Sequence, residues 1–481
     1  MRPRVVIVVC DGLRPDRIDP VRTPALWRLR EEGVAYDESR TVFPSETRVA
    51  AASLVTGAWP GEHGLLANDF YDPAVFPDRA VATANADDLA AVAQARGRLL
   101  ARPTLAERLA RVGLRYAAVS TASPGTSLII AAGATPPHGF AWTIHRAIGT
   151  SAAVSDEIER LFGPPPSHAI PRTATIEHAA RVFTDYVLPR IDPDLAVFWC
   201  GEPDSTYHYR GVGSPEAAQA EAAADAVVAR VLAWRAAGAE AGRTQVIVAS
   251  DHGHVSGIER LDVAHALRNA GWRVAGGMPG DGEILVVPGA ASFVHGLGPG
   301  SRTEREMLNW LADQPWFGAA FTRAAGLGVA SIDTLGIAHP RQPDLVFTLR
   351  QGDEADTLGV AGTCVYDADI PLGGGMHGGL HRRELANVLL LSGSAMRAAP
   401  RRLASPAGLL DIAPTVLSIL GVPAPDLGGR VLREALGGAA MSSIVPERLA
   451  PAAARAPTCL SRTRLGDAFY LDGLDAVGGG R

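Results

Sequence analysis

Aspartate and histidine residues follow several short apolar runs of this sequence, and side chains of these two types can bind metal ions. Carboxylates that lie close together repel one another and raise each other's pKa unless cations hold them. Imidazole and carboxylate together form a ligand set that suits zinc and similar metals. The residues are Asp11, Asp204, His208, Asp251 and His252, with His377 in a glycine-rich turn at 373–379.

Asp204 and His208 are four residues apart, so a helical turn would present both side chains to one ion. A nucleophile is expected near the metals at the start of a helix, where unpaired N–H groups favour negative charge. The stretch 43–48, followed by a helical VAAASLVTG pattern, meets this expectation. From the residues alone, either Ser45 or Thr47 could be the nucleophile.

Each of these residues also has a structural interpretation when it is taken alone. Asp11 could cap a turn, His252 could be a core histidine, Thr47 a helix-start residue and His377 a surface residue. The predicted topology places them at one sheet edge, which favours a shared site. Three other histidines have weaker claims. We expect His63 to pack or cap near the turn after Gly57, and His254 and His381 to support the ligands from behind.

The apolar runs that must position these residues are rich in β-branched side chains and do not alternate with polar ones. Such strands are buried on both faces, which is typical of a parallel sheet covered by helices. Helix signals lie between them, such as the capping box that begins at Thr104. We predict a doubly wound, mostly parallel α/β sheet, whose ligands bind at the carboxyl ends of the strands. The predicted strands are 5–10, 116–120, 195–200, 245–250 and 387–392.

Two stretches rich in Gly, Pro and His interrupt this pattern and are predicted to be cap insertions, at 135–175 and 255–372. The core then comprises 1–134, 176–254 and 373–436. The last segment, 437–481, is rich in Ala, Pro and Gly, and we expect it to be irregular.

The composition of the 481 residues is that of a globular protein, with a formal net charge of −6. This charge predicts neither a nucleic-acid polymer nor a membrane as partner. The chain has no lysine, which excludes mechanisms that need one. Its four cysteines show no CxxC spacing and are expected to be reduced. The first apolar run, 5–10, is too short for a signal peptide or a membrane span, so we expect a cytoplasmic protein.

In this order along the chain, the motifs resemble the alkaline phosphatase superfamily and, within it, the nucleotide pyrophosphatase/phosphodiesterase (type I phosphodiesterase) family. The resemblance covers the core from both ends and leaves the two insertions unmatched. The motifs are VVIVVCDGLRPD, TPALWRLREEGV, FPSETRVAAASLVTGAWPGEHGLLANDFYDP, WCGEPDSTYH, VASDHG, GGMHG and DIAPTVLSILGVP.

The resemblance implies a two-metal phosphoric ester hydrolase that acts through a covalent phosphothreonine on Thr47. It implies that Asn68 binds a non-bridging phosphate oxygen. It also implies two divalent cations, for which we expect zinc, with manganese or iron as alternatives. The implied ligands are Asp204, His208 and His377 for one ion, and Asp11, Asp251, His252 and the Thr47 oxygen for the other.

Several alternatives stay open within this resemblance. A phosphonoacetate-hydrolase-like enzyme would cleave a C–P bond with the same metals, and a phosphomonoesterase would take a more highly charged ester. Either way, the expected substrate is a small anionic phosphate ester or phosphonate. A sulfatase is disfavoured because no cysteine lies near the nucleophile, and the phosphomutases resemble a different motif set. From another class, a non-catalytic nucleotide-binding protein would keep the metals without turnover.

The sequence departs from the family pattern directly after the nucleophile. Arg48 stands where family members usually carry an aromatic residue. Its guanidinium is a planar fork that suits an extra anionic oxygen or a substrate carboxylate. Our hypothesis is that Arg48 favours more highly charged substrates. The opposing interpretation is that Arg48 lies on an exposed helix face and pairs with Glu46 or solvent.

Overall fold

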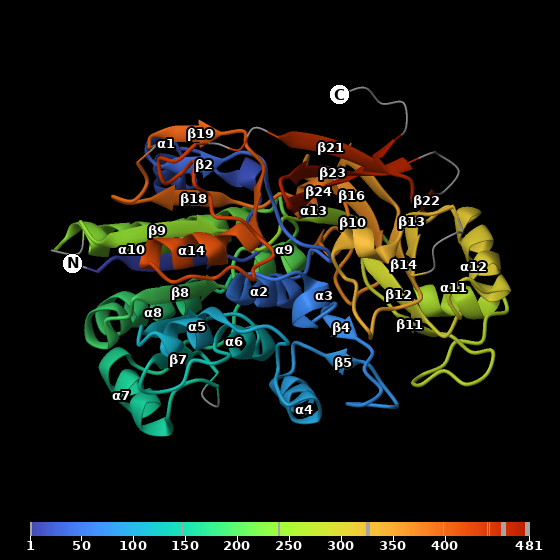
Figure 1. The fold of residues 1–481 in the computed structure, drawn as a ribbon, viewed down its shortest axis with the longest axis horizontal. Coiled ribbons are helices and arrows are strands. Elements are labelled where there is room, and N and C mark those ends of the chain that lie inside the picture. Colours follow the sequence, from blue (N-terminus) through green and yellow to red (C-terminus); the bar gives the residue numbers. More distant parts are fainter. Residues whose placement is uncertain are drawn as a thin grey trace.

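An eight-stranded sheet forms the centre of the protein (Figure 1). The structure is a computed structural model that describes residues 2–145, 148–238, 241–323, 328–397, 399–439, 441, 443–453 and 458–476. In spatial order the strands are β19 (Arg401–Leu403), β2 (Val34–Tyr36), β18 (Leu389–Ser392), β9 (Thr244–Ala249), β1 (Arg4–Cys10), β8 (Leu195–Cys200), β6 (Tyr116–Ser120) and β7 (Gly139–Thr143).

Helices cover both faces of this sheet. Successive side chains of β1 alternate between two hydrophobic clusters, with Val5 in one and Val6 in the other. The first cluster includes residues of α2 (Thr47–Thr56), α5 (Leu105–Arg111), α6 (Pro124–Ile130) and α14 (Ile412–Leu420), and the second includes residues of α1 (Pro24–Glu32), α8 (Thr173–Val182) and α10 (Pro215–Ala236).

The predicted doubly wound, mostly parallel α/β sheet is thus confirmed. One predicted helix start also forms as expected. Thr104 Oγ1 accepts a hydrogen bond from the Glu107 N–H at 3.2 Å, and the Glu107 carboxylate accepts one from the Thr104 N–H at 2.8 Å.

Strand β18 runs antiparallel to β9 and β2, although its continuous apolar sequence suggested a parallel strand. Its first residue, Leu389, lies beside Ala249 at the carboxyl end of β9. The segment before β18 therefore reaches the same sheet edge as the segments that follow β1, β8 and β9. His377, which precedes a strand in the sequence, is placed with the other candidate ligands for this reason.

The expected insertion 255–372 forms a separate lobe beside the large sheet, at the right of Figure 1. Strand β10 pairs with β17, so the lobe is joined to the turn that carries His377. The lobe contains β10 (Val255–Arg260), β11 (Leu285–Val287), β12 (Ala291–His295), β13 (Phe317–Thr322), β14 (Leu345–Leu349), β15 (Gln351–Ala355), β16 (Ala361–Tyr366), α11 (Val263–Asn269) and α12 (Arg302–Ala312), and β17 is Gly375–Met376.

The other expected insertion, 135–175, contributes β7 to the large sheet, where it pairs in parallel with β6. It is therefore not wholly a cap. Gly and Pro residues flank this short strand, so the sequence pattern did not predict it. The last three residues of the strand are buried. We retain the division into a core and one inserted lobe at 255–372 as a proposal.

Much of the described part of the final segment is not irregular, which corrects the expectation for 437–481. Strands β21 (Ile444–Leu449), β23 (Thr458–Leu465) and β24 (Ala468–Ala476) form an antiparallel sheet. The Phe469 ring stacks on Trp59 at 4.1 Å, and Tyr470 Oη donates to Asp411 Oδ2 at 2.9 Å. These contacts with residues distant in sequence order a segment whose composition suggested none.

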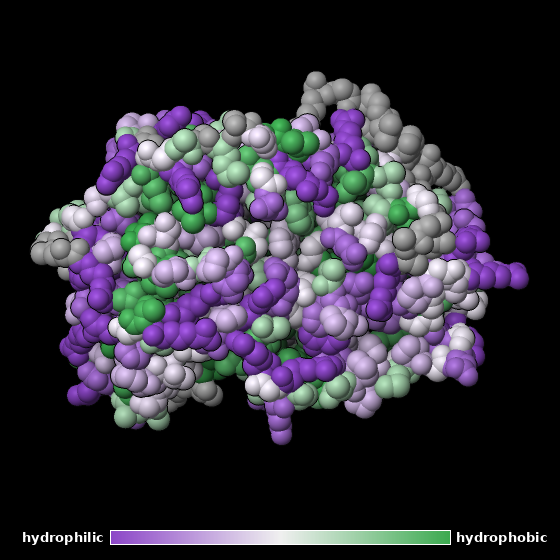
Figure 2. All heavy atoms as spheres, in the orientation of Figure 1, coloured by the Kyte–Doolittle hydropathy of each residue, from purple (hydrophilic) through white to green (hydrophobic). Residues whose placement is uncertain are grey.

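Hydrophilic and hydrophobic residues are interspersed on the face of the molecule seen in Figure 2. Among the described residues, no helix has both the length and the apolar character needed to cross a membrane.

Candidate metal centre

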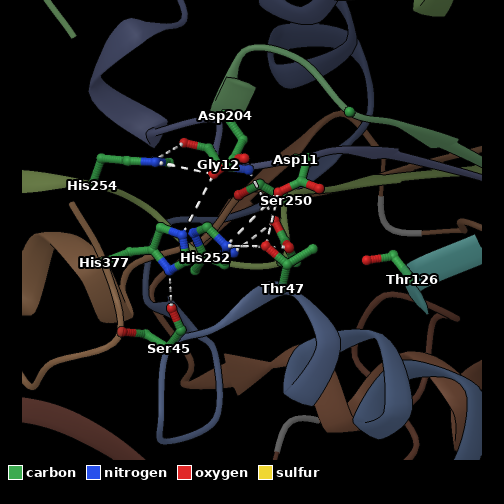
Figure 3. A network of polar contacts seen from close by, with 12 residues as sticks. Asp11, Gly12, Ser45, Thr47, Thr126, Asp204, Ser250, His252, His254 and His377 are labelled. Atoms are coloured by element: carbon green, nitrogen blue, oxygen red, sulfur yellow. Dashed lines mark hydrogen bonds and ion pairs between the residues drawn. The ribbon is translucent and has the colours of Figure 1, made fainter. Parts of the chain in front are cut away.

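The candidate ligands lie at the carboxyl ends of three neighbouring parallel strands. Asp11 follows β1, and the Asp251–His252 pair follows β9. Asp204 and His208 lie on α9 (Asp204–Arg210), a short helix after β8, so the expected helical turn is present. Figure 3 shows the side chains of Asp11, Asp204 and His252 gathered near those of His377 and Thr47.

These side chains form two groups that could each hold a metal ion. Within each group, one ligand atom from every residue lies within 4.8 Å of the others. The two groups are adjacent because the rings of His252 and His377 stack with centroids 3.8 Å apart. The groups are Asp204, His208, His254 and His377, and Asp11, Asp251 and His252.

Each histidine of the two groups has its Nδ1 atom beside a backbone carbonyl oxygen. A carbonyl oxygen only accepts hydrogen bonds, so Nδ1 carries the proton and Nε2 of the neutral ring has a lone pair. Each Nε2 atom is directed into the centre, as is usual for metal-binding histidines. The contacts are His208 with Gly375 at 2.7 Å, His377 with Ser45 at 2.8 Å, His252 with Gly253 at 3.1 Å and His254 with Gly12 at 3.1 Å.

The carboxylates of the second group use one oxygen for a hydrogen bond and direct the other into the centre. Asp11 Oδ2 accepts from the Trp199 indole N–H at 2.9 Å. Asp251 Oδ1 accepts from the backbone N–H of Gly12 at 2.9 Å, while its buried Oδ2 has no hydrogen-bond partner. The two remaining oxygens are therefore available as ligands.

The distances between ligand atoms match those around a tetrahedral metal ion. With bonds of about 2.1 Å, neighbouring ligand atoms lie about 3.3 Å apart. In the first group, Asp204 Oδ1 lies 3.2 Å from His208 Nε2 and 3.5 Å from His377 Nε2. In the second group, His252 Nε2 lies 3.3 Å from Asp251 Oδ2 and 3.7 Å from Asp11 Oδ1.

The electrostatics of the second ligand group disfavour negative charge on its two carboxylates. Burial raises the pKa of Asp251 to about 7, and burial together with the charges of Asp251 and Asp204 raises the pKa of Asp11 well above its ordinary value. Burial lowers the pKa of His252 to about 3, so its ring is neutral. Divalent cations would relieve the repulsion between the carboxylates and use the imidazole lone pairs.

Of the two candidate nucleophiles, Thr47 faces the second group. Thr47 Oγ1 lies 3.1 Å from His252 Nε2 and 3.5 Å from Asp11 Oδ1, as a fourth ligand atom would. Ser45 Oγ instead donates to the Gly379 carbonyl at 3.1 Å and accepts from the Gly378 N–H at 2.9 Å. The geometry therefore favours Thr47 and gives Ser45 a role in holding the turn that carries His377.

The structure distinguishes among the remaining histidines. His254 lies within the first ligand group, nearer the centre than the supporting position expected for it. His63 is a structural residue near the turn after Gly57, since its Nε2 atom lies 3.0 Å from Ser53 Oγ and its Nδ1 accepts from the Leu65 N–H. His381 lies outside both groups and contacts Asp353. The VASDHG motif, read one residue further, would have pointed to His254.

Asn68 and Arg48 lie beside the start of α2. The Asn68 side-chain oxygen accepts a hydrogen bond from the Arg48 backbone N–H at 3.3 Å. The side-chain nitrogen of Asn68 therefore points away from the Arg48 backbone. The half-buried Arg48 side chain donates from Nε to Thr83 Oγ1 at 3.3 Å. Arg48 is thus not on an exposed helix face, and its charge acts on His208 as well as on Glu46.

The doubly wound sheet, with its ligand-bearing edge, has an alkaline-phosphatase-like fold. A family profile described as type I phosphodiesterase / nucleotide pyrophosphatase matches residues 5–310. The chain belongs to this family.

Short matches to two relatives agree with this assignment. The chain is 36% identical over 70 residues to the bis(5'-adenosyl)-triphosphatase enpp4 of Xenopus laevis, and equally to the human ectonucleotide pyrophosphatase/phosphodiesterase family member 5. These matches span 15% of this chain and 16% and 15% of the respective relatives.

Two solved structures share the fold. Murine ectonucleotide pyrophosphatase/phosphodiesterase 5, in an inactive form with AMP, superposes with a TM-score of 0.61 at 17% identity over 90% of this chain and 100% of the other. Phosphonoacetate hydrolase from Sinorhizobium meliloti, with phosphonoformate, superposes with a TM-score of 0.62 at 18% identity over 88% and 96%.

Proposed function

We propose that this protein hydrolyses small phosphate esters, with two divalent cations and Thr47 as nucleophile. The observation that carries the proposal is the orientation of the four imidazoles. Their Nδ1 atoms are held by backbone carbonyls and their Nε2 atoms converge beside the carboxylates, next to a threonine hydroxyl. Family membership supports phosphoester hydrolysis as the reaction.

The cations, when bound, would lower the pKa of the Thr47 hydroxyl and stabilise negative charge on the leaving oxygen. The Thr47 hydroxyl gives its proton to solvent and its oxygen bonds to phosphorus, while the bond to the leaving oxygen breaks and that oxygen departs with the electron pair, to be protonated by solvent. The Asn68 amide nitrogen and the Thr47 N–H, which is in the first turn of α2, hold the non-bridging oxygens. Water then cleaves the bond between Thr47 and phosphorus, which restores the hydroxyl.

We expect zinc in both positions. Carboxylate oxygen and imidazole nitrogen suit zinc, and the ligand spacing suits its tetrahedral geometry. Manganese and iron accept the same ligands, so metal analysis of the purified protein is the direct check.

A substrate panel tests the proposed activity. We expect zinc-loaded protein to hydrolyse an aryl phosphodiester and a dinucleotide faster than an aryl phosphomonoester or phosphonoacetate, and a chelator to abolish turnover. The measurement is kcat/KM for all four compounds on one preparation. If no compound is turned over above the solvent rate, the alternative of a non-catalytic nucleotide-binding protein is favoured. Fastest turnover of phosphonoacetate would move the assignment to C–P bond cleavage.

Arg48 is proposed to set the preference for substrate charge. Its half-buried guanidinium lies one residue from the nucleophile, so an extra anionic oxygen on a monoester or phosphonate could pair with it. We expect Arg48→Phe to lower the monoester-to-diester ratio of kcat/KM by about tenfold, as loss of one charge-assisted hydrogen bond implies.

The control for this ratio is Arg210→Phe. Arg210 is exposed and lies two residues from His208, and its guanidinium donates to the Tyr209 carbonyl. This variant should keep the wild-type ratio. An unchanged ratio in Arg48→Phe would show that Arg48 does not read substrate charge.

A further inference from the structure

His254 is a fully buried member of the first ligand group, on the segment that continues from Asp251 and His252 of the second group. Its ring contacts the rings of Tyr207 and His377, each with centroids 5.1 Å away. Figure 3 shows its side chain directed at Asp204. The position is therefore tightly enclosed, and the ring has one orientation.

The ring nitrogens of His254 have different neighbours. Nδ1 lies 3.1 Å from the Gly12 carbonyl oxygen, so it carries the proton of the neutral ring. Nε2 lies 3.1 Å from Asp204 Oδ1, yet neither of these two buried atoms has a hydrogen-bond partner. A lone pair therefore faces a carboxylate oxygen, and both atoms are shielded from solvent. Such an arrangement is costly unless a cation binds both atoms.

The spacing supports a shared metal ion. The distance of 3.1 Å between His254 Nε2 and Asp204 Oδ1 is close to the 3.2 Å between His208 Nε2 and Asp204 Oδ1. Both are near the separation of about 3.3 Å expected between two ligands of one tetrahedral ion.

The turn after β1 leaves room for the ring. Gly12 has a φ of +69°, and a Cβ atom there would lie 2.3 Å from His254 Cε1. The missing side chain at this position lets the imidazole pack directly against the backbone.

We propose that His254 is a fourth protein ligand of the first cation position, which three imidazoles and one carboxylate then hold, so that a substrate oxygen would have to enter as a fifth ligand. The inference rests on the proposed metal-dependent function and adds a residue to its ligand set. A site richer in nitrogen favours zinc or cobalt over magnesium or manganese. The segment that supplies Asp251 and His252 to the second position would then also supply His254 to the first.

The test is a count of the coordinated imidazoles in the wild-type protein loaded with Co²⁺ in both positions. Each imidazole bound through Nε2 keeps an exchangeable Nδ1–H, which the paramagnetic ion shifts far from other proton NMR signals. We expect four such signals, one each from His208, His254, His377 and His252. Three signals would overturn the proposal but leave the proposed function intact. The absence of shifted signals would overturn both.

A variant assigns the additional signal. In His254→Gln we expect one shifted signal to disappear, the visible Co²⁺ spectrum to change, and metal affinity at one position to fall by at least about tenfold. The matched control is His381→Gln, another buried histidine beside an aspartate but outside both groups, which should keep every signal. Weaker binding with an unchanged spectrum would instead make His254 a positioning residue that acts through Asp204, and would overturn the proposal.

Discussion

Replacement of Thr47 with alanine is expected to lower kcat by about 10³-fold or more while both metal ions stay bound. The hydroxyl oxygen is the atom proposed to attack phosphorus, and no other described hydroxyl is as well placed beside the second ligand group. Thr47 Oγ1 is 3.1 Å from His252 Nε2, whereas Ser45 Oγ is bound to the backbone of Gly378 and Gly379. Zinc content and turnover of an aryl phosphodiester, measured on the same sample, give the result.

Ser45→Ala is the matched control, because it removes a neighbouring hydroxyl that supports the turn carrying His377. This variant should stay active, with a modest loss for the missing hydrogen bonds. In the wild-type protein, an acid quench during turnover should trap the substrate phosphoryl group on the peptide that contains Thr47. An adduct on Ser45, or an inactive Ser45→Ala with an active Thr47→Ala, would move the nucleophile to Ser45.

Replacement of Asp204 with alanine should remove one of the two metal ions and at least about 10³-fold of the activity. Asp204 Oδ1 is the atom that the first group shares, at 3.2 Å from His208 Nε2 and 3.5 Å from His377 Nε2. The variant loses the only carboxylate of that group. The expected loss corresponds to several kcal/mol of transition-state stabilisation. Metal analysis together with kcat/KM distinguishes this variant from Thr47→Ala, which keeps both ions.

Asp353→Ala is the control for this variant. Asp353 is also an aspartate beside a histidine, but it is exposed on β15 of the lobe, where it pairs with His381 and Arg382. Metal content and activity should stay at wild-type levels. A full metal count with full activity in Asp204→Ala would refute the assignment of the first group.

The central strands and the ligands that follow them could be predicted from sequence because both depend on local patterns. Continuous apolar runs predicted β1, β8 and β9, and in a parallel sheet the residue after each strand must reach the same edge. Asp11, Asp204 and Asp251 are therefore brought together by topology alone.

Other features depended on contacts between distant segments. An apolar run does not show whether its strand runs parallel or antiparallel, so the direction of β18, and with it the placement of His377, came only from pairing with β9. The C-terminal strands are ordered by contacts such as Phe469 on Trp59, which composition does not reveal.

The amino-acid sequence by itself determined the class of fold, the family resemblance and a candidate ligand set, because residue type and spacing along one chain are enough for these. Only the tertiary structure placed the Thr47 hydroxyl rather than that of Ser45 beside the second ligand group, showed Arg48 to be half-buried and placed His254 within the first ligand group. These outcomes depend on where side chains point. The direction of a side chain is set by partners that are distant in the sequence. The Gly12 carbonyl orients His254, and the Gly378 N–H orients Ser45.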